Sequence, residues 1–412
     1  MILCNFVAEK LNMMPTTDSK TTAFILEHKN DDVRTLALQA SKFHDIDMNE
    51  ALVQIAGRQI AAKKIPSWAS INEIKYPKHL SMEQCSSEVT AQYKASLVSG
   101  QTLTDLTAGL GVDFSFIARN FQQATYVERQ EALCEIAKHN FKVLGLNHVL
   151  IQCTDGIEYL KEMNPVDCLF LDPARRDANG GKTVAISECE PDVCTLEPLL
   201  IEKGEKVLIK LSPMLDMHSA LTELKHVTEL HIVSVNNECK ELIIILEKGD
   251  TTHLNGAKEV TISCEQVVNN LPSQHLDFTI SEEKNSPCII AEGIGKYLYE
   301  PGAALLKAGP YRLLSSRFGV QKLHPNSHLY TSEELVNFPG RRFQVIESSN
   351  FGKKELKNFL KDIDKANLTV RNFPTSVADL RKKLKLKEGG DLYLFATTLS
   401  NGEKVLIKGV KC

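Results

Sequence analysis

The hydrophobic and polar positions of roughly the first 75 residues recur at helical spacing. The segment DDVRTLALQASKF begins with aspartates, and MNEALVQIAGRQIAAKKI repeats its apolar pattern until Pro66. Apolar residues three and four positions apart share one face of a helix, and a proline commonly ends such a segment. The sequence predicts an N-terminal helical region over residues 1–78. Just after this region, Ser81 and Gln84 match a capping box, which predicts that a helix begins there.

Near residue 101 the pattern changes to short apolar runs that alternate with helical segments. The predicted strands are QTLTDL, ATYVE, HVLIQC, VDCLFLD and EKVLIKL, then ELHIVSV and ELIIILEKG across the short polar link NNECK. Strands that alternate with helices indicate a parallel sheet covered on both faces. The short link indicates a closing hairpin, whose last strand is antiparallel. We expect an α/β fold with a seven-stranded sheet over residues 79–252.

Beyond residue 253 short strands and helical segments are mixed, which predicts α+β domains. Residues 253–335 include the helical stretch GAALLKAGPYRLLSSRF. Residues 336–412 include the helices KKELKNFLKDI and SVADLRKKLKL and two closing strands joined by SNG, a hairpin turn signal. We therefore expect two C-terminal domains, at 253–335 and 336–412.

Composition and charge narrow the class of protein. The net charge is −4, but residues 341–412 hold 16 Lys and Arg against 8 Asp and Glu, so this segment carries +8 and the rest −12. A basic segment on an acidic body favours a polyanionic partner, although a solvated surface is an alternative. The 11 cysteines form no CxxC pair, which favours reduced thiols in the cytoplasm. No Cys or His cluster has zinc-ligand spacing, so we expect no metal. No apolar run reaches the roughly 18 residues of a membrane helix.

A glycine-rich turn follows the first predicted strand in LTDLTAGLG. Asp105 closes that strand, and Gly109 and Gly111 allow the backbone to approach a ligand closely. Ligands of open α/β sheets lie at the carboxyl ends of the strands. The third glycine of a GxGxxG fingerprint is absent, which disfavours NAD. A tight connection without a ligand is the alternative interpretation of this turn.

Acidic residues also close the next three predicted strands. Glu128 ends the second strand 23 positions after Asp105, Asp155 follows the third in TDG, and Asp172 follows the fourth in LDPARRD. An acid in the position of Glu128 can accept both ribose hydroxyls of a nucleoside, and Asp155 could accept an adenine amino proton. Each acid alone could be an ordinary exposed strand-end residue. Together they would lie along one edge of one sheet.

The order DLTAGLG, VE, TDG and LDPA resembles that of class I S-adenosylmethionine-dependent methyltransferases over residues 80–250. The resemblance implies a Rossmann-like sheet of seven strands and S-adenosylmethionine as the cofactor. It implies that Glu128 binds the ribose and Asp155 the adenine, with their neighbours Arg129 and Gly156 beside them. It implies methionine contacts from Asp105 and the turn, and a contact from Gln84 in the segment before the first motif. The candidate cofactor residues are Gln84, Asp105, Thr107, Ala108, Gly109, Gly111, Glu128, Arg129, Asp155, Gly156 and Asp172.

The motif LDPAR is similar to the (Asp/Asn)-Pro-Pro-(Tyr/Phe) motif of amino methyltransferases and to the DPPR of RNA uracil-C5 methyltransferases. The resemblance makes Asp172, Pro173 and Arg175 the catalytic candidates. Ala174 and Arg175 replace the second proline and the aromatic residue, which disfavours amine chemistry. Ser212 stands where the uracil group has a cysteine nucleophile, which disfavours a covalent mechanism.

The C-terminal half resembles a narrower group. The stretch YEPGAALLKAGPYRLLSSRFGVQKLHPNSHLYTS and the following FPGRRFQV are similar to bacterial methyltransferases that carry ferredoxin-like and THUMP-like domains after the catalytic domain. THUMP domains in other proteins help to bind tRNA, so the resemblance implies an RNA partner, tRNA or rRNA. The candidate phosphate contacts are Arg341, Arg342, Lys353, Lys354, Arg381, Lys382 and Lys383. Within HPNSHLY we expect a loop held by side-chain hydrogen bonds rather than a metal site.

Three functions are therefore open. The first is an S-adenosylmethionine-dependent methyltransferase of an RNA base. The second is a methyltransferase of a small molecule or a protein, and the third is an RNA-binding protein that keeps the cofactor fold without turnover. The sequence does not specify the oligomeric state.

Overall fold

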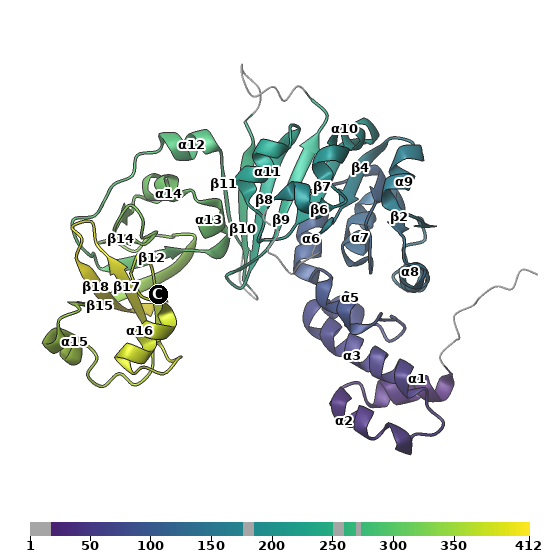
Figure 1. Ribbon diagram of the computed structural model, residues 1–412, viewed down its shortest axis with the longest axis horizontal. Coiled ribbons are helices and arrows are strands. Elements are labelled where there is room, and N and C mark those ends of the chain that lie inside the picture. Colours follow the sequence, from purple (N-terminus) through teal and green to yellow (C-terminus); the bar gives the residue numbers. More distant parts are fainter. Residues whose placement is uncertain (1–17, 176–184, 250–258, 269–272) are drawn as a thin grey trace, which may run out of the picture. The chain divides into compact units, whose positions relative to one another are not determined.

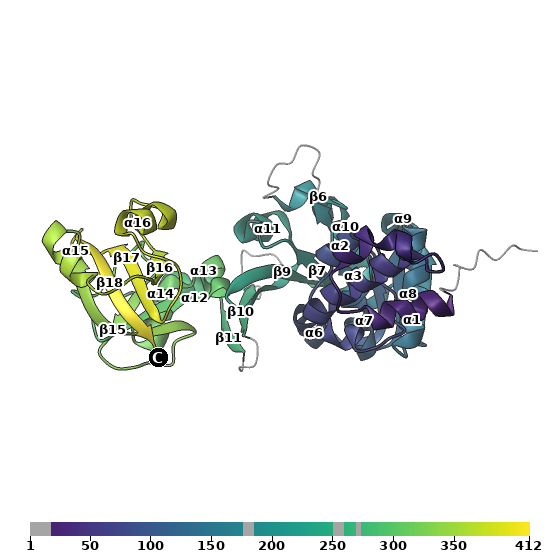
Figure 2. The same cartoon turned by 90° about the horizontal axis from the view of Figure 1, so that it is seen from below.

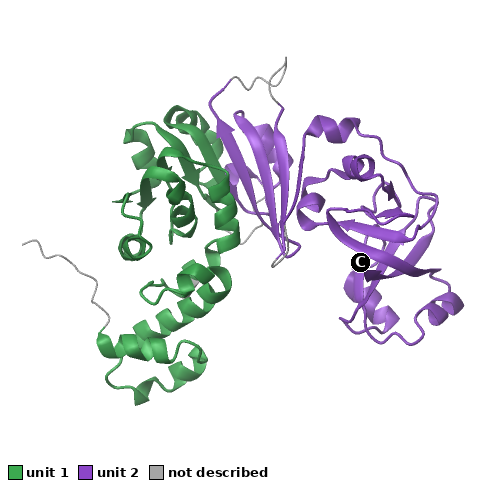
Figure 3. Ribbon diagram, turned by 180° about the vertical axis from the view of Figure 1, so that it is seen from behind, with its two compact units in different colours: residues 1–175, 189–209 green, residues 176–188, 210–412 purple. Residues whose placement is uncertain are grey.

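The computed structural model describes residues 18–175, 185–249, 259–268 and 273–412 (Figure 1). The chain divides into two compact units (Figure 3): unit 1 comprises residues 1–175 and 189–209, and unit 2 comprises residues 176–188 and 210–412. We describe each unit by itself.

The described part of unit 1 begins with helices, as the apolar spacing predicted, whereas residues 1–17 of the predicted helical region lie outside the described residues. They are α1 (Ser19–Glu27), α2 (Val33–Leu38), α3 (Met48–Lys64), α4 (Pro66–Ala69), α5 (His79–Gln84) and α6 (Glu88–Ser96). The aspartates before α1, α2 and α3 cap these helices, because each carboxylate accepts a hydrogen bond from a backbone N–H of the first turn. The prediction of a cap at Ser81 is wrong. Ser81 lies inside α5, whereas Ser87 has extended backbone and caps α6 through the N–H of Thr90.

A parallel sheet follows in unit 1. Its strands are β1 (Gly100–Asp105), β2 (Phe121–Glu128), β3 (Val149–Cys153), β4 (Val166–Leu171) and β7 (Gly204–Leu211), in the spatial order β3-β2-β1-β4-β7. Helices α7 (Val112–Ile117) and α8 (Glu131–Val143) cover one face, and α9 (Gly156–Glu162) and α10 (Val193–Lys203) cover the other (Figure 1). This arrangement brings the carboxyl ends of β1 to β4 to the same edge.

Unit 2 opens with α11 (Met217–Glu223) and the predicted hairpin of β8 (Val227–Val235) and β9 (Glu238–Glu247). The turn is shorter than the predicted link, because Asn236 and Asn237 alone form it, both with positive φ. Asparagine tolerates this backbone conformation, which suits a two-residue hairpin turn. β10 (Thr261–Val267) pairs in parallel with β8, and β11 (Gln274–Phe278) is antiparallel to β10.

The rest of unit 2 contains a second sheet with the order β13-β14-β12-β15-β18-β17-β16. Its strands are β12 (Tyr297–Pro301), β13 (Gln321–Lys322), β14 (Tyr330–Ser332), β15 (Gly340–Asn350), β16 (Asn367–Val370), β17 (Leu392–Thr398) and β18 (Lys404–Lys411). The helices are α12 (Ile280–Asn285), α13 (Ala303–Ala308), α14 (Tyr311–Phe318), α15 (Lys353–Phe359) and α16 (Val377–Leu384). Helices α15 and α16 pack on this sheet, α15 against β15 and α16 against β16 (Figure 2). Phe359 of α15 and Leu380 of α16 share one core cluster with Leu394 and Leu406 of the sheet.

These observations confirm the predicted α/β fold class. The predicted strands of the first sheet correspond to β1 to β4, β7, β8 and β9. Strands β10 and β11 were not part of the expected seven-stranded sheet. In unit 2, β10 pairs with β8, and β11 pairs with β10. The division into four domains stays a prediction. Among the described helices, none combines the length and apolar character that crossing a membrane requires.

Candidate functional site

The turn after β1 is hydrogen-bonded to both neighbouring strands. The N–H of Leu106 donates to the carbonyl oxygen of Phe170 over 3.0 Å, and the N–H of Ala108 donates to that of Val127 over 3.1 Å. Gly111 precedes α7 with a φ of 80°. A Cβ at Gly111 would lie 2.7 Å from the ring of Phe141, so both backbone conformation and space require glycine.

Hydrogen bonds to Glu128 connect this turn to the end of β2. Its Oε2 accepts a hydrogen bond from the N–H of Gly109 over 3.0 Å, and its Oε1 accepts one from the N–H of Gln130 over 2.8 Å. The residue is 9% exposed. Because each carboxylate oxygen can accept two hydrogen bonds, both retain an acceptor position for a ligand.

Asp155 and Gly156 form the start of α9. Oδ1 of Asp155 accepts hydrogen bonds from the N–H groups of Ile157 and Glu158, over 2.9 and 3.2 Å. Both bonds end on Oδ1, which leaves Oδ2 for a ligand. A Cβ at Gly156 would lie 2.0 Å from the carbonyl oxygen of Leu106, so α9 and the turn after β1 approach each other closely enough to require glycine.

Asp172 lies beside the same turn at the end of β4. Its N–H donates to Oγ1 of Thr107 over 2.7 Å, and the N–H of Thr107 donates to Oδ1 of Asp105 over 3.0 Å. Pro173 is buried. Ala174 is exposed and begins the short strand β5 (Ala174–Arg175), which pairs with β6 (Cys189–Glu190). The side chain of Arg175 lies outside the described part of the structure.

A cavity opens at this edge of the unit 1 sheet. Of the predicted cofactor residues, its lining contains Thr107, Glu128, Arg129, Asp155, Gly156 and Asp172. The predicted cofactor residues Asp105, Ala108, Gly109 and Gly111 are not among the lining residues. The sequence interpretation missed the apolar wall of Leu160 and Leu196 and the residues Gln130 and Glu190. Leu160 lies in α9 and Leu196 in α10, the helices that follow β3 and β6.

Asp105 is a buried carboxyl next to the residues that line this cavity. The residue is 1% exposed, and Oδ2 is buried without a hydrogen-bond partner among the described residues. Burial raises the pKa of Asp105 well above its ordinary value, and the neighbouring carboxylates of Asp113, Asp172 and Glu128 raise it further. A cationic group bound beside these carboxylates would favour the ionised form. S-adenosylmethionine carries two such groups, its sulfonium and its α-ammonium, so the residues present fit this cofactor.

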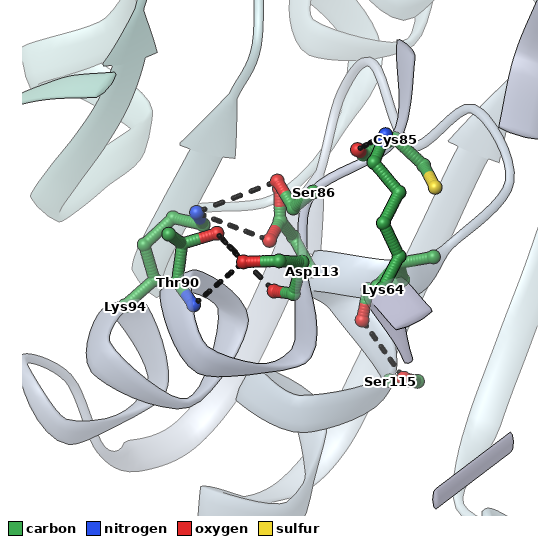
Figure 4. Close-up of polar contacts among 9 residues, drawn as sticks. Lys64, Cys85, Ser86, Thr90, Lys94, Asp113 and Ser115 are labelled. Atoms are coloured by element: carbon green, nitrogen blue, oxygen red, sulfur yellow. Dashed lines mark hydrogen bonds and ion pairs between the residues drawn. The ribbon is translucent and has the colours of Figure 1, made fainter. Parts of the chain in front are cut away.

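The segment before β1 is bonded to α7 (Figure 4). The hydroxyl of Ser86 donates to Oδ2 of Asp113 over 2.7 Å, and the fully buried Nζ of Lys94 lies 3.2 Å from Oδ1 of Asp113. Nζ of Lys64 in α3 donates to the carbonyl oxygen of Cys85 over 2.9 Å. Gln84 is exposed and does not line the cavity. Its role as a cofactor contact stays a prediction.

The predicted phosphate contacts of unit 2 fall into two groups. Arg341 is bonded to the buried carboxylate of Glu300, the guanidinium of Arg342 donates to Asn337 over 3.2 Å, and that of Arg381 donates to the carbonyl oxygen of Ala366 over 3.1 Å. The other four side chains are exposed and form no ion pair among the described residues, and they are Lys353, Lys354, Lys382 and Lys383.

The HPNSHLY segment forms a loop held by side-chain hydrogen bonds. Nδ1 of His324 lies 2.9 Å from the N–H of Asn326 and 3.0 Å from Nδ2 of Asn372. The ring of His328 stacks on that of Tyr311. In the described ranges, no three His, Cys, Asp or Glu side chains are grouped as metal ligands.

The sheet order β3-β2-β1-β4-β7, the glycine turn after β1 and the acids that close β1 to β4 define a class I methyltransferase fold. Comparison with known proteins agrees. Residues 37–178 match the protein-L-isoaspartate(D-aspartate) O-methyltransferase family model, residues 297–339 match a ferredoxin-like domain, and residues 340–409 match a THUMP-like domain.

Two relatives extend over most of the chain. The crystal structure of a protein from Porphyromonas gingivalis W83, described as a methyltransferase, is 34% identical with a TM-score of 0.83, covering 95% of this chain and 98% of that one. An uncharacterized S-adenosylmethionine-dependent methyltransferase of Mycobacterium tuberculosis H37Rv is 22% identical over 334 residues, which are 80% of this chain and 87% of the relative. The chain belongs to the family of S-adenosylmethionine-dependent methyltransferases with C-terminal ferredoxin-like and THUMP-like domains.

Proposed function

We propose that this S-adenosylmethionine-dependent methyltransferase acts on a base of RNA, tRNA or rRNA. The observation that carries the proposal is a set of exposed lysines within the THUMP-like segment 340–409 that form no ion pair in the described part of the chain. They are Lys353, Lys354, Lys382 and Lys383. Residues 341–412 carry a net charge of +8, against −12 for the rest of the chain. Exposed lysines that form no ion pair with the other described residues favour a polyanion such as RNA.

In cofactor binding, each strand-end acid would have a separate role. The free acceptor positions of Glu128 would receive the ribose hydroxyls, and Oδ2 of Asp155 would receive the adenine amino group. Asp105 and the turn from Thr107 to Gly111 would hold the methionine part. The apolar side chains of Leu160 and Leu196 would contact the faces of the adenine and exclude water.

At the substrate end, Asp172 would receive the target base. S-adenosylmethionine supplies a methyl group already activated by its sulfonium, so the chain's main task is positioning rather than proton transfer. The hydrogen bond from Asp172 N–H to Thr107 ties the substrate end to the cofactor turn. Asp172 would orient a polar group of the base, with Pro173 and Arg175 as its predicted partners at this end.

The lysines would bind the phosphate backbone. Of the predicted contacts, Arg341 is the least available, because it is bonded to Glu300, which also pairs with Arg371. We therefore assign the phosphate contacts chiefly to the four exposed lysines, and a structural role in unit 2 to Arg341.

The match of residues 37–178 to the isoaspartate O-methyltransferase model supports a protein substrate as a second candidate. That match covers β1 to β4 and hence the candidate cofactor residues, but not the basic C-terminal segment. A protein substrate would leave the exposed lysines of residues 340–409 without a part in catalysis.

The test is transfer of a labelled methyl group from S-adenosylmethionine to total bacterial RNA and, in parallel, to total bacterial protein. A variant with Lys353, Lys354, Lys382 and Lys383 changed to alanine should lose most of its RNA affinity. The affinity that remains should depend less on salt concentration than that of the wild type. The matched control changes the exposed lysines Lys29, Lys42, Lys63 and Lys138 of unit 1. Label in RNA that depends on the first set of lysines supports the proposal, whereas label in protein alone contradicts it.

A further inference from the structure

The hydroxyl of Tyr126 reaches the glycine turn from β2. Tyr126 is fully buried, and its Oη donates a hydrogen bond to the carbonyl oxygen of Gly109. Glu128, two residues further along the same strand, accepts the N–H of Gly109 over 3.0 Å. Alternate residues of a strand face the same side. Two side chains on one face of β2 therefore form hydrogen bonds with the carbonyl oxygen and the N–H of Gly109.

Gly109 depends on these two hydrogen bonds for its conformation. It has a φ of 55°, in the left-handed region. Apart from its chain neighbours, a Cβ at this position would meet one described atom within 4 Å, the carbonyl oxygen of Thr107 at 4.0 Å, so little packing restrains the residue. By contrast, close contacts with neighbouring atoms restrain two other glycines of the site, Gly111 and Gly156.

The ring of Tyr126 is itself held rigidly. It makes edge contacts with Phe114, at a centroid distance of 5.7 Å, and with Phe141, at 5.3 Å. Gly111 completes the contact, because a Cβ there would lie 3.3 Å from the Tyr126 ring. Burial raises the pKa of Tyr126, so its hydroxyl stays protonated and remains a donor. The hydroxyl is thus a fixed donor rather than a mobile one.

We infer that Tyr126 is a positioning residue for cofactor binding, acting through Gly109 on the carboxylate of Glu128. With the Gly109 carbonyl held, its N–H stays directed at Oε2 of Glu128 and fixes that side chain in its cavity-lining rotamer. Tyr126 does not line the cavity. The inference rests on the proposed role of Glu128 at the ribose.

The experiment is calorimetric titration of S-adenosylmethionine into the full chain. Tyr126→Phe removes the hydroxyl and keeps the aromatic cluster. We expect it to weaken binding about threefold to tenfold, the range for one lost hydrogen bond. In a Glu128→Ala background, the same change should weaken binding no further, because the group through which Tyr126 acts is gone. Glu128→Gln, which keeps the side-chain length, serves as a second background.

Tyr76→Phe is the matched control. Tyr76 is also buried in unit 1, but its hydroxyl has no hydrogen-bond partner among the described residues, so we expect unchanged affinity. Wild-type affinity in Tyr126→Phe, or an equal loss with and without Glu128, would overturn the inference. Wild-type protein that is folded but does not bind S-adenosylmethionine would instead contradict the proposed function on which the inference rests.

Discussion

The N–H of Gly109 donates to the carboxylate of Glu128 over 3.0 Å, so the turn after β1 and the end of β2 form one hydrogen-bonded unit. The acid assigned to the ribose is thus also a structural part of the turn assigned to the methionine moiety. This coupling explains how a turn with only two glycines keeps its shape. It also means that changes to Glu128 affect both parts of the cofactor site.

The pKa of Asp105 predicts a pH dependence of cofactor binding. Burial and neighbouring carboxylates raise the pKa of Asp105 above its ordinary value of 3.8 in the folded chain. At a pH between the ordinary pKa of the unfolded chain and the raised pKa of the folded chain, folded Asp105 holds a proton that unfolded Asp105 has lost. The free energy of unfolding therefore falls as the pH rises through this range. A cationic cofactor favours the ionised form. Binding should therefore release a proton there and strengthen as the pH rises.

Calorimetry in buffers of different ionisation enthalpy, from about pH 5 to about pH 8, measures this proton release. The Asp105→Asn variant should bind more weakly and without this proton release. Proton release that is identical in the variant and the wild type would assign the titration to another group.

Gly156→Ala should disrupt the contact between α9 and the turn after β1. The added Cβ would lie 2.0 Å from the carbonyl oxygen of Leu106, which cannot be accommodated without a backbone shift. We expect a loss of about 1–3 kcal/mol in the free energy of unfolding, together with weaker cofactor binding. Denaturant unfolding measures the first and calorimetry the second. Gly293→Ala, where the Cβ would meet nothing within 4 Å, should change neither.

We expect the buried side chains of Lys94 and Asp113 to stabilise unit 1 only when both are present. Lys94 is fully buried, with Nζ 3.2 Å from Asp113 Oδ1. Asp113→Asn leaves a buried ammonium without its carboxylate, which should cost about 3 kcal/mol of the free energy of unfolding. The double variant Asp113→Asn with Lys94→Met should recover part of this loss. Unfolding curves of the two single variants and the double variant measure the coupling, and strictly additive losses would contradict it.

The strand-end acids could be predicted from the sequence because their signals are local. Glu128, Asp155 and Asp172 each follow a short apolar run, and parallel strands bring such positions to one edge. The structure gives all three a place in the same cavity lining. The N-terminal helices and the hairpin at Asn236 followed equally from local patterns.

Pairings between distant residues could not be predicted in this way. Arg341 was expected to contact phosphate, but its guanidinium meets Glu300, which lies 41 positions earlier in the chain. Lys94 lies in a polar stretch of the sequence, yet Asp113 and Ser86 allow it to be fully buried. Tyr126 belongs to no recognised sequence motif. Its positioning role follows from its hydrogen bond to the carbonyl oxygen of Gly109. Such roles depend on which surfaces the fold brings together.

The most direct test of the account is calorimetric titration of S-adenosylmethionine into the wild-type chain and the Glu128→Ala variant. The account predicts binding by the wild type and a loss of about tenfold or more in the variant, equivalent to about 1.4 kcal/mol. Circular dichroism of both proteins confirms that they are folded. A folded wild type that does not bind, or a variant that binds equally well, would contradict the assignment of this strand edge as the cofactor site.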